Sequence, residues 1–338
     1  MESNPLSLQP SSVTNILTLR YDPSIIPNLP RKTSKHFKPS HEEHSVEFIE
    51  KAIVNTLRKK LDISSVKKIC IALSGGIDST LVLTLIKKTI PDLRVDAISI
   101  KFADSIDETE SASKIAAELD TNHHIVYVDN YLRELPKAIS IIKLPFSDLH
   151  WYHVVKKSQS LAKHLASGDG GDELFGGYTF RYKKFLSLIE HDSTTSEKIK
   201  IYLSCHERDR VPDQEKLFTK KANFSWKSIY ESLTPFFDNS LSPLEQVFLA
   251  DYNGKLLYNF NPINSRIING FDMEMLAPIL NEELLSLGPH IPKHYKYDED
   301  NNIGKLPLRT ILKQSKHYSL VTKQKLGFNV NTANLWKS

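Results

Sequence analysis

The sequence predicts an α/β protein built on a parallel sheet with helices on both faces. Two short apolar runs rich in β-branched residues, 66–73 and 95–102, are typical of buried parallel strands. Amphipathic helical patterns alternate with these runs, which indicates βαβ units. A glycine-rich loop follows the first run directly, and ligands of such sheets bind at the carboxyl ends of the strands. This loop therefore marks the expected ligand-binding edge.

The N-terminal 44 residues have a different composition, rich in serine, proline and asparagine. Because proline interrupts regular structure, we predict an extended, partly ordered arm whose elements are short. Ser45 follows as a candidate helix cap, and apolar residues from Val46 to Leu61 recur on one helical face. An amphipathic helix is expected to lead from the arm into the core.

Strand and helix patterns alternate up to about residue 128. Apolar and β-branched runs predict strands, and 3.6-residue periodicity predicts helices between them. The predicted strands are 66–73, 95–102 and 124–128, and the predicted helices are 79–89 and 107–119. From about residue 175 the pattern is helical, without convincing strand alternation. We therefore expect an arm over 1–44 and one domain over 45–338, of which 175–338 is a mainly helical part.

Composition narrows the class of protein. The net charge of +4 is spread along the chain without a concentrated basic tract, so we expect no nucleic-acid partner. Cys70 and Cys205 are too few and too far apart for a disulfide framework or a zinc site. No stretch approaches the roughly 20 apolar residues that span a bilayer, and the N-terminus does not resemble a signal peptide. These features predict a cytoplasmic protein with no membrane partner.

The segment Ser74-Gly75-Gly76-Ile77-Asp78-Ser79 has the features of a phosphate-binding loop. Glycines let backbone N–H groups approach phosphate oxygens, and the following helix presents its positive end to the anion. The Gly-Lys-Ser/Thr ending of a Walker loop is absent, which disfavours a kinase or a motor ATPase. A carboxylate at Asp78 would be repelled by phosphate unless Mg²⁺ bridges them. A plain turn is the alternative, and the placement between strand and helix favours nucleotide binding.

The segment Ser167-Gly168-Asp169-Gly170-Gly171-Asp172-Glu173 concentrates three acids among three glycines. Such carboxylates repel one another unless a cation or a shared proton offsets their charge. The alternatives are a solvated turn or a calcium loop, but the alternating acidic spacing of calcium loops is absent. Paired with the first segment, this loop suits an enzyme that breaks ATP between its α- and β-phosphates.

Both segments resemble the signatures of the asparagine synthetase-type ATP pyrophosphatases, which implies an adenine nucleotide alpha hydrolase-like fold. The second signature, continuing to Tyr178, is nearly confined to the asparagine synthetase branch, which includes β-lactam synthetase. Weaker similarity covers roughly 45–330. It includes Met273 to Leu280, Gly304 to Arg309 and Lys323 to Phe328.

The resemblance implies a two-step reaction that uses ATP and Mg²⁺. An aspartate carboxylate attacks the α-phosphate to give β-aspartyl-AMP and pyrophosphate, and ammonia then displaces AMP. The implied ATP-binding residues are Leu73, Ser74, Gly75, Gly76, Asp78, Ser79, Ile100, Ser167 and Gly168. The implied metal ligands are Asp78 and Asp172, and the implied catalytic residues are Asp169, Lys325 and Glu274. Lys325 would neutralise pyrophosphate, and Asp169 replaces a longer glutamate that helps ammonia attack.

Three departures from the family pattern bear on substrate and partner. Glu2 follows Met1 where glutamine-dependent members carry a cysteine, so ammonia is expected from solution or from a separate glutaminase subunit. Leu276 and Ser265 stand where the family usually has arginine and aspartate, which leaves the carboxylate acceptor open. The sequence also leaves a homodimer open.

We therefore expect a carbon–nitrogen ligase, with aspartate as the default small-molecule substrate. One alternative is amide or lactam formation on another carboxylate metabolite or a sugar acid. An alternative of another class is a nonenzymatic nucleotide-binding subunit, which the proline-rich arm would dock on a partner.

Overall fold

The computed structural model describes residues 9–38, 45–61, 65–103, 107, 109–130, 132–146, 149–206 and 214–321. Its centre is a five-stranded sheet in the order β3-β2-β1-β4-β5, with every neighbouring pair parallel. The strands are β1 (Lys68–Ala72), β2 (Arg94–Phe102), β3 (Asn122–Val128), β4 (His164–Ala166) and β5 (Glu274–Leu276). The predicted parallel α/β architecture is confirmed.

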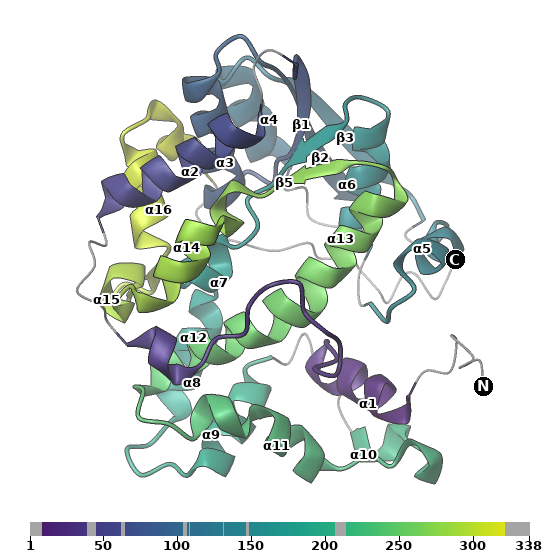
Figure 1. Cartoon of the computed structure of the whole chain (residues 1–338), viewed down its shortest axis with the longest axis vertical. Coiled ribbons are helices and arrows are strands. Elements are labelled where there is room, and N and C mark those ends of the chain that lie inside the picture. The colour runs from purple at the N-terminus through teal and green to yellow at the C-terminus, as the bar shows by residue number, and fades with distance from the viewer. Residues whose placement is uncertain are drawn as a thin grey trace.

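Helices cover both faces of the sheet (Figure 1). In β1, Ile69 and Ile71 join one hydrophobic core, whereas Cys70 joins the other, because successive side chains of a strand point to opposite faces. The helices of the first core include α2 (Val46–Lys60), α3 (Ile77–Thr89) and α4 (Thr109–Glu118), together with several from the part of the chain after residue 170. Those of the second are α5 (Leu135–Ile142), α6 (His150–Gln159) and α13 (Asn261–Gly270).

The strands and helices predicted before residue 128 are all present, with ends that agree to within two residues. Ser45 caps α2 as expected, since its Oγ accepts the N–H of Phe48 at 3.1 Å. The sequence did not predict β4 and β5, because three-residue strands are too short for an alternating pattern. These two strands complete the sheet beside β1.

The part after residue 175 is mainly helical, as predicted, and lies largely below the sheet in Figure 1. It also contributes short strands for which the sequence has no convincing alternation, namely β5 and the hairpin of β6 (Tyr297–Asp298) and β7 (Ile303–Gly304). Besides α13, the α-helices described here, starting with the short α7, are α7 (Gly171–Phe175), α8 (Thr179–Leu188), α9 (Thr195–Ser204), α10 (Gln214–Leu217), α11 (Trp226–Phe237), α12 (Pro243–Asp251), α14 (Glu282–Leu287), α15 (Lys293–Lys296) and α16 (Leu306–Lys313). The same part contains a π-helix, η4 (Tyr252–Phe260), and the short 3₁₀ helices η3 (Lys220–Ala222), η5 (Pro278–Leu280), η6 (Gly288–His290) and η7 (Lys316–Leu320).

The N-terminal segment differs from the extended arm that we expected. It contains a ten-residue helix, α1 (Pro10–Leu19), and a 3₁₀ turn, η1 (Ser34–Phe37). The amide of Asn253 bonds both backbone groups of Lys32, at 2.9 and 3.0 Å, and Tyr252 donates to the carbonyl of Pro30 at 3.1 Å. Buried polar side chains thus replace the missing regular hydrogen bonds of this segment, which crosses the helical part in Figure 1.

The strand order creates a switch point between β1 and β4. The chain runs outward from β1 to β2 and β3, and then returns to the other side of β1 to form β4. Loops that leave neighbouring strands in opposite directions open a crevice at their carboxyl ends. The two loops singled out in the sequence follow β1 and β4, so the topology brings them together.

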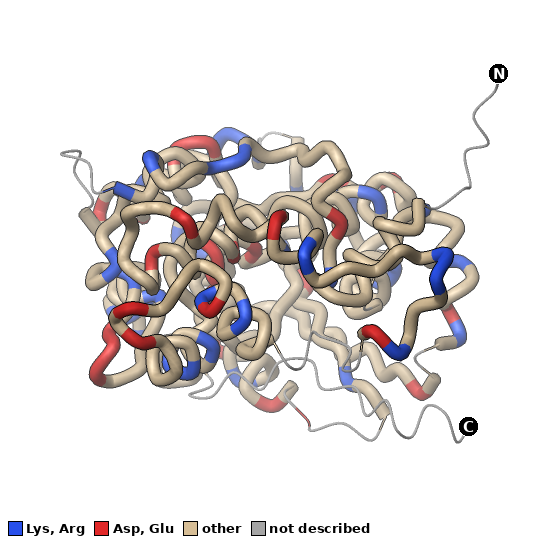
Figure 2. Tube along the Cα trace, turned by 90° about the horizontal axis from the view of Figure 1, so that it is seen from below, with Lys and Arg blue, Asp and Glu red and all other residues tan. Residues whose placement is uncertain are grey.

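Charge and hydropathy agree with a chain folded around these cores. Lys and Arg are interspersed with Asp and Glu along the trace (Figure 2). Among the described residues, no helix is both long enough and apolar enough to cross a bilayer.

Candidate active site

The first loop links β1 to α3 and is held by its own serines. Gly75 adopts φ +75°, which favours glycine, and an added Cβ there would lie 3.0 Å from Ser111. The Oγ of Ser74 accepts the N–H of Gly76 at 3.3 Å and lies 3.2 Å from the Oγ of Ser79. The serines therefore fix the turn at the start of α3, where an anion would meet the positive end of the helix.

The second loop follows β4 and packs directly on the first. Ser167 continues the sheet by donating its N–H to the carbonyl of Leu276 at 2.9 Å. A Cβ added to Gly168 would lie 2.6 Å from the Cβ of Asp78, so only glycine allows this approach. Gly170, at φ +94°, turns the chain into α7, which carries Asp172 in its first turn.

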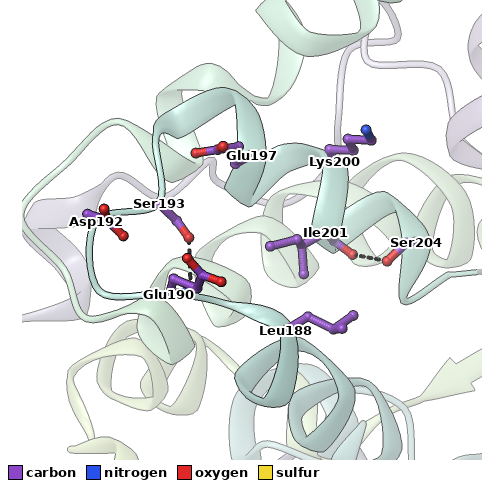
Figure 3. Close-up of a pocket in the computed structure, with 8 residues that line it drawn as sticks. All are labelled: Leu188, Glu190, Asp192, Ser193, Glu197, Lys200, Ile201 and Ser204. Carbon is purple, nitrogen blue, oxygen red and sulfur yellow. Dashed lines mark hydrogen bonds between the residues drawn. The ribbon is translucent and has the colours of Figure 1, made fainter.

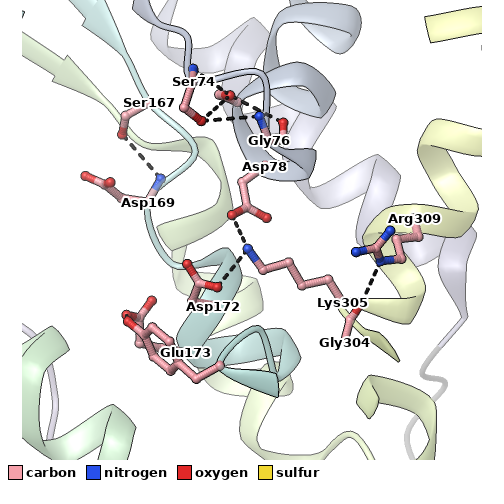
Figure 4. A network of polar contacts seen from close by, with 12 residues as sticks. Ser74, Gly76, Asp78, Ser167, Asp169, Asp172, Glu173, Gly304, Lys305 and Arg309 are labelled. Atoms are coloured by element: carbon pink, nitrogen blue, oxygen red, sulfur yellow. Dashed lines mark hydrogen bonds and ion pairs between the residues drawn. The ribbon is translucent and has the colours of Figure 1, made fainter. Parts of the chain in front are cut away.

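Lys305 joins the two loops through its ammonium group. Its Nζ lies 2.8 Å from Oδ1 of Asp172 and also forms an ion pair with Oδ2 of Asp78. Figure 4 shows the lysine reaching between the two carboxylates from the segment that precedes α16. The structure therefore places the carboxylates of Asp78 and Asp172, the expected metal ligands, beside the same ammonium group.

Electrostatics in this cluster favour the ionised forms. Burial by itself would lower the pKa of Lys305, but the negative charges of Asp172 and Asp78 outweigh burial and raise that pKa. The lysine is therefore an ammonium ion at neutral pH. Lys305 belongs to the segment Gly304 to Arg309, which resembles the family, but the sequence assigned no role to this lysine.

Asp169 lies on the other side of the second loop, pointing away from Lys305 (Figure 4). Loss of hydration raises the pKa of its carboxyl to about 6, although hydrogen bonds from Ser167 and Asn264 oppose the rise. Asn264, on α13, donates its Nδ2 to Oδ2 of Asp169 at 3.3 Å. The two acids of this loop thus face different surroundings. Asn264 was missed because it lies 95 residues from Asp169 and belongs to no motif.

Leu73 and Ile100 lie close to this edge of the sheet. The N–H of Leu73 bonds the carbonyl of Ile98 at 2.9 Å, and its carbonyl accepts the hydroxyl of Ser99 at 2.5 Å. Ile100 is buried in the second core near the end of β2. The N–H of Leu73 is thus already used by the sheet.

The structure does not bring Glu274 to the loops. β4 and β5 are parallel, and Glu274 pairs with His164 at their amino ends, whereas the second loop leaves the carboxyl end of β4. The side chain of Glu274 is 61% exposed and forms an ion pair with His164 at 3.1 Å. Strand direction thus places Glu274 at the amino end of β5, and its catalytic role stays a prediction. Lys325 lies outside the described residues.

The family model described as asparagine synthase matches residues 49–337, which covers both loops and most of the chain. The chain belongs to the asparagine synthase family. Asparagine synthetase [glutamine-hydrolyzing] 1 of Bacillus subtilis is 28% identical over 196 residues, covering 56% of this chain and 29% of that protein. The chain thus spans less than a third of the length of this relative.

A second relative is named as an ammonia-dependent enzyme. The NH(3)-dependent NAD(+) synthetase of Carboxydothermus hydrogenoformans is 34% identical over 87 residues, covering 26% of this chain and 35% of that protein. Among solved structures, NMN synthetase from Francisella tularensis aligns with a TM-score of 0.32 and 17% identity, over 61% of this chain and 92% of that one. The family and the synthetase relatives are carbon–nitrogen ligases.

A separate hollow lies between the end of α8 and α9, remote from the loops (Figure 3). It is lined by Leu188, Glu190, Asp192, Ser193, Glu197, Lys200, Ile201 and Ser204. Its lining includes no residue of either loop, so we do not assign it to the active site.

Proposed function

We propose that this protein amidates a carboxylate at the expense of ATP, through an acyl-adenylate. One observation carries the proposal: the two loops that meet between β1 and β4 bring Asp78 and Asp172 to a single cation. That crevice is where α/β sheets bind nucleotides, and the family consists of ligases that form amides. Asparagine synthesis from aspartate is the proposed default.

The residues fit a magnesium ion. Asp78 and Asp172 supply the carboxylate oxygens that Mg²⁺ prefers, and the ammonium of Lys305 already stands in for a cation between them. The described residues hold no cluster of three or more His, Cys, Asp and Glu suited to a metal, so phosphate oxygens and water would complete the coordination. When bound, Mg²⁺ would neutralise charge on the triphosphate.

The protein groups have distinct tasks in the first step. The substrate carboxylate attacks the α-phosphorus, the bond to the oxygen bridging the β-phosphorus breaks, and pyrophosphate leaves with that electron pair. We propose that the loop of Ser74 to Ser79 binds the phosphates through its N–H and hydroxyl groups. The described chain ends at Val321, and Leu320 accepts the hydroxyl of Ser111 at 2.6 Å, beside Gly75. The similarity of its segment to the family's lysine motif supports the proposal that Lys325, which lies outside the described residues, neutralises pyrophosphate.

Asp169 serves the second step in this proposal. Ammonia attacks the acyl carbon, AMP leaves with the oxygen that it shared with the acyl group, and the nitrogen loses a proton. A carboxylate with a pKa of about 6 is ionised at neutral pH and accepts a proton more readily than an ordinary aspartate does. The ammonia would come from solution or from a partner glutaminase.

A second candidate acceptor is a carboxylate other than aspartate. Leu276, where the family usually has arginine, is buried in the first hydrophobic core. Arg266 donates to the carbonyl of Ile142 at 2.8 Å, at the end of α5. Leu276 thus offers the acceptor no guanidinium group of the kind expected in an aspartate pocket, and this favours another carboxylate metabolite or a sugar acid.

The test is a panel of carboxylates incubated with pure protein, Mg-ATP and ammonium, with pyrophosphate and amide measured separately. With an ¹⁸O-labelled carboxylate, an acyl-adenylate must pass one labelled oxygen to AMP. Label in AMP with aspartate and asparagine formation would support the default, whereas label with another acid only would reassign the acceptor. ATP binding without cleavage across the panel would contradict the enzyme proposal and favour a nucleotide-binding subunit.

A further inference from the structure

The segment before α16 is shaped to deliver one ammonium group to the two loops. Lys305 has φ +60°, a left-handed conformation that is uncommon outside glycine, and its N–H bonds the carbonyl of Phe175 at 2.9 Å. A Cβ added to Gly177 would collide with both Cε of Lys305 and Oδ1 of Asp172. The lysine therefore passes through a space that only glycine leaves open, which fixes its position.

The charges in this cluster are mutually dependent. The side chains of Lys305, Asp78 and Asp172 are 8%, 16% and 15% exposed, so water screens them poorly. Two carboxylates that share one contact repel each other unless a cation lies between them. Lys305 lies between Asp78 and Asp172 and provides that cation.

A metal ion and the ammonium group of Lys305 compete for the position between the two carboxylates. A metal ion that coordinates Oδ2 of Asp78 and Oδ1 of Asp172 needs the lone pairs that now receive the ammonium. A metal ion on these carboxylates would also meet the positive charge of Lys305 where water screens it poorly, so metal entry favours displacement of the ammonium, which then needs another anion. The phosphates of a nucleotide would supply one beside the first loop.

We propose that Lys305 is an internal counter-ion of the nucleotide-free protein, which holds Asp78 and Asp172 together and opposes metal binding until nucleotide phosphates accept its ammonium group. The inference rests on the proposed function only in taking these two aspartates as metal ligands. It makes Lys305 a positioning residue that couples metal binding to nucleotide binding, and such coupling is reciprocal.

The experiment is a titration with Mn²⁺, a paramagnetic substitute for Mg²⁺, in the absence of nucleotide and acceptor. Free Mn²⁺ is followed by electron paramagnetic resonance for the wild type and for Lys305→Met, which keeps the length of the side chain and removes its charge. We expect Lys305→Met to bind Mn²⁺ about tenfold more tightly or better. Asp78→Asn in the Lys305→Met background should abolish the gain.

Two further variants distinguish the effect of the charge of Lys305 on Mn²⁺ binding from a general structural effect of replacing a buried lysine. Lys296→Met removes another buried lysine, which faces the rings of Phe37 and Phe248, and should leave Mn²⁺ binding as in the wild type. Lys305→Arg keeps a cation and should keep metal binding weak. Mn²⁺ should also raise the melting temperature of Lys305→Met more than that of the wild type, because a metal replaces the missing counter-ion.

The proposal is overturned if Lys305→Met binds Mn²⁺ no more tightly than the wild type. It is overturned equally if the nucleotide-free wild type binds Mn²⁺ tightly at Asp78 and Asp172, a result that requires no variant to fold. Because no nucleotide or acceptor is present, these outcomes leave the amidation proposal untouched. A carboxylate screen without turnover would, in the same way, leave the ion-exchange result standing.

Discussion

The edge of the sheet and the helical part each bury a lysine, with opposite consequences. Lys305 and Lys296 are nine residues apart, and 6% and 2% of their surfaces are exposed. Two carboxylates raise the pKa of Lys305. Burial lowers the pKa of Lys296 to about 7, an effect that the charge of Glu245 only partly opposes. Its Nζ lies 5.6 and 5.4 Å from the ring centres of Phe37 and Phe248.

The difference lies in the counter-ions. Around Lys305, opposite charges compensate one another's loss of hydration, so the cluster remains ionised and suited to binding a charged substrate. Lys296 faces aromatic rings, which attract a cation more weakly than carboxylates do. Its burial thus weakens folding at neutral pH, and we expect it to matter for stability and not for ATP chemistry.

The largest expected effect is on the carboxylates beside Lys305. Replacing Asp172 with Asn removes one negative charge from the proposed metal site and from the surroundings of Lys305, and should slow pyrophosphate release about 10³-fold. A steady-state pyrophosphate assay with saturating Mg-ATP and the active acceptor measures it. The control is Glu299→Gln, which loses only a surface ion pair with Lys293 of 2.9 Å. A loss smaller than tenfold in Asp172→Asn would contradict the assigned role.

The next largest effect is expected at Asp169, which lies in the same loop as Asp172 but points away from Lys305. Its pKa of about 6 predicts that amide formation falls as pH drops below 6, since the ionised carboxylate is the base. Asp169→Asn should slow amide formation about 100-fold and remove this acidic limb, while pyrophosphate formation continues. Rates of both products measured across pH test this. An acidic limb that persists in the variant would exclude Asp169 as its source.

The third prediction concerns Lys296 and stability. Lys296→Met should raise the free energy of unfolding by about 2 kcal/mol at pH 7, because an apolar side chain replaces a buried cation. The pKa of Lys296 in the folded protein lies below its ordinary value of 10.5. Between pH 7 and 10.5, the side chain is therefore mostly protonated in the unfolded chain and mostly neutral in the folded chain. Wild-type stability contributed by this group therefore rises over that range.

Urea unfolding at pH 7 and at about pH 10 measures this difference. The variant should lack the part of the pH-dependent rise that comes from Lys296, and its pyrophosphate release should equal that of the wild type. A destabilised variant would show instead that the contacts of the ammonium with Phe37 and Phe248 outweigh its loss of hydration.

A smaller effect is expected at Asn264. Its hydrogen bond to Asp169 lowers the pKa of that carboxyl, so Asn264→Ala should move the acidic limb of amide formation to higher pH. Gln at this position should restore part of the wild-type profile if the donor is what matters. An unchanged limb would show that the hydrogen bond has no role in the reaction.

The smallest effect is expected at Glu274, outside both buried lysine environments. Glu274→Gln breaks an exposed ion pair with His164, and exposed pairs contribute only about 0–1 kcal/mol. Pyrophosphate and amide formation should change by less than about threefold. A large loss of either activity would return Glu274 to the catalytic residues and show that β5 moves when substrates bind.

The sequence by itself determined the features that depend on neighbouring residues. The spacing of apolar residues after Ser45 identified α2 and its cap, and the apolar runs identified β1, β2 and β3. Glycines and acids at Ser74 to Ser79 and Ser167 to Glu173 indicated the two loops, because turn geometry and phosphate chemistry impose local residue types.

Only the tertiary structure decided which distant groups meet. Lys305 lies 227 residues from Asp78 in the chain, and Asn264 lies 95 residues from Asp169. Their contacts depend on how α16 packs against α2 and α3 and how α13 packs against β5, which no periodicity encodes. The direction of β5 likewise removed Glu274 from the loops. Local patterns specify elements and loops, whereas the compensation of buried charge depends on packing between elements far apart in sequence.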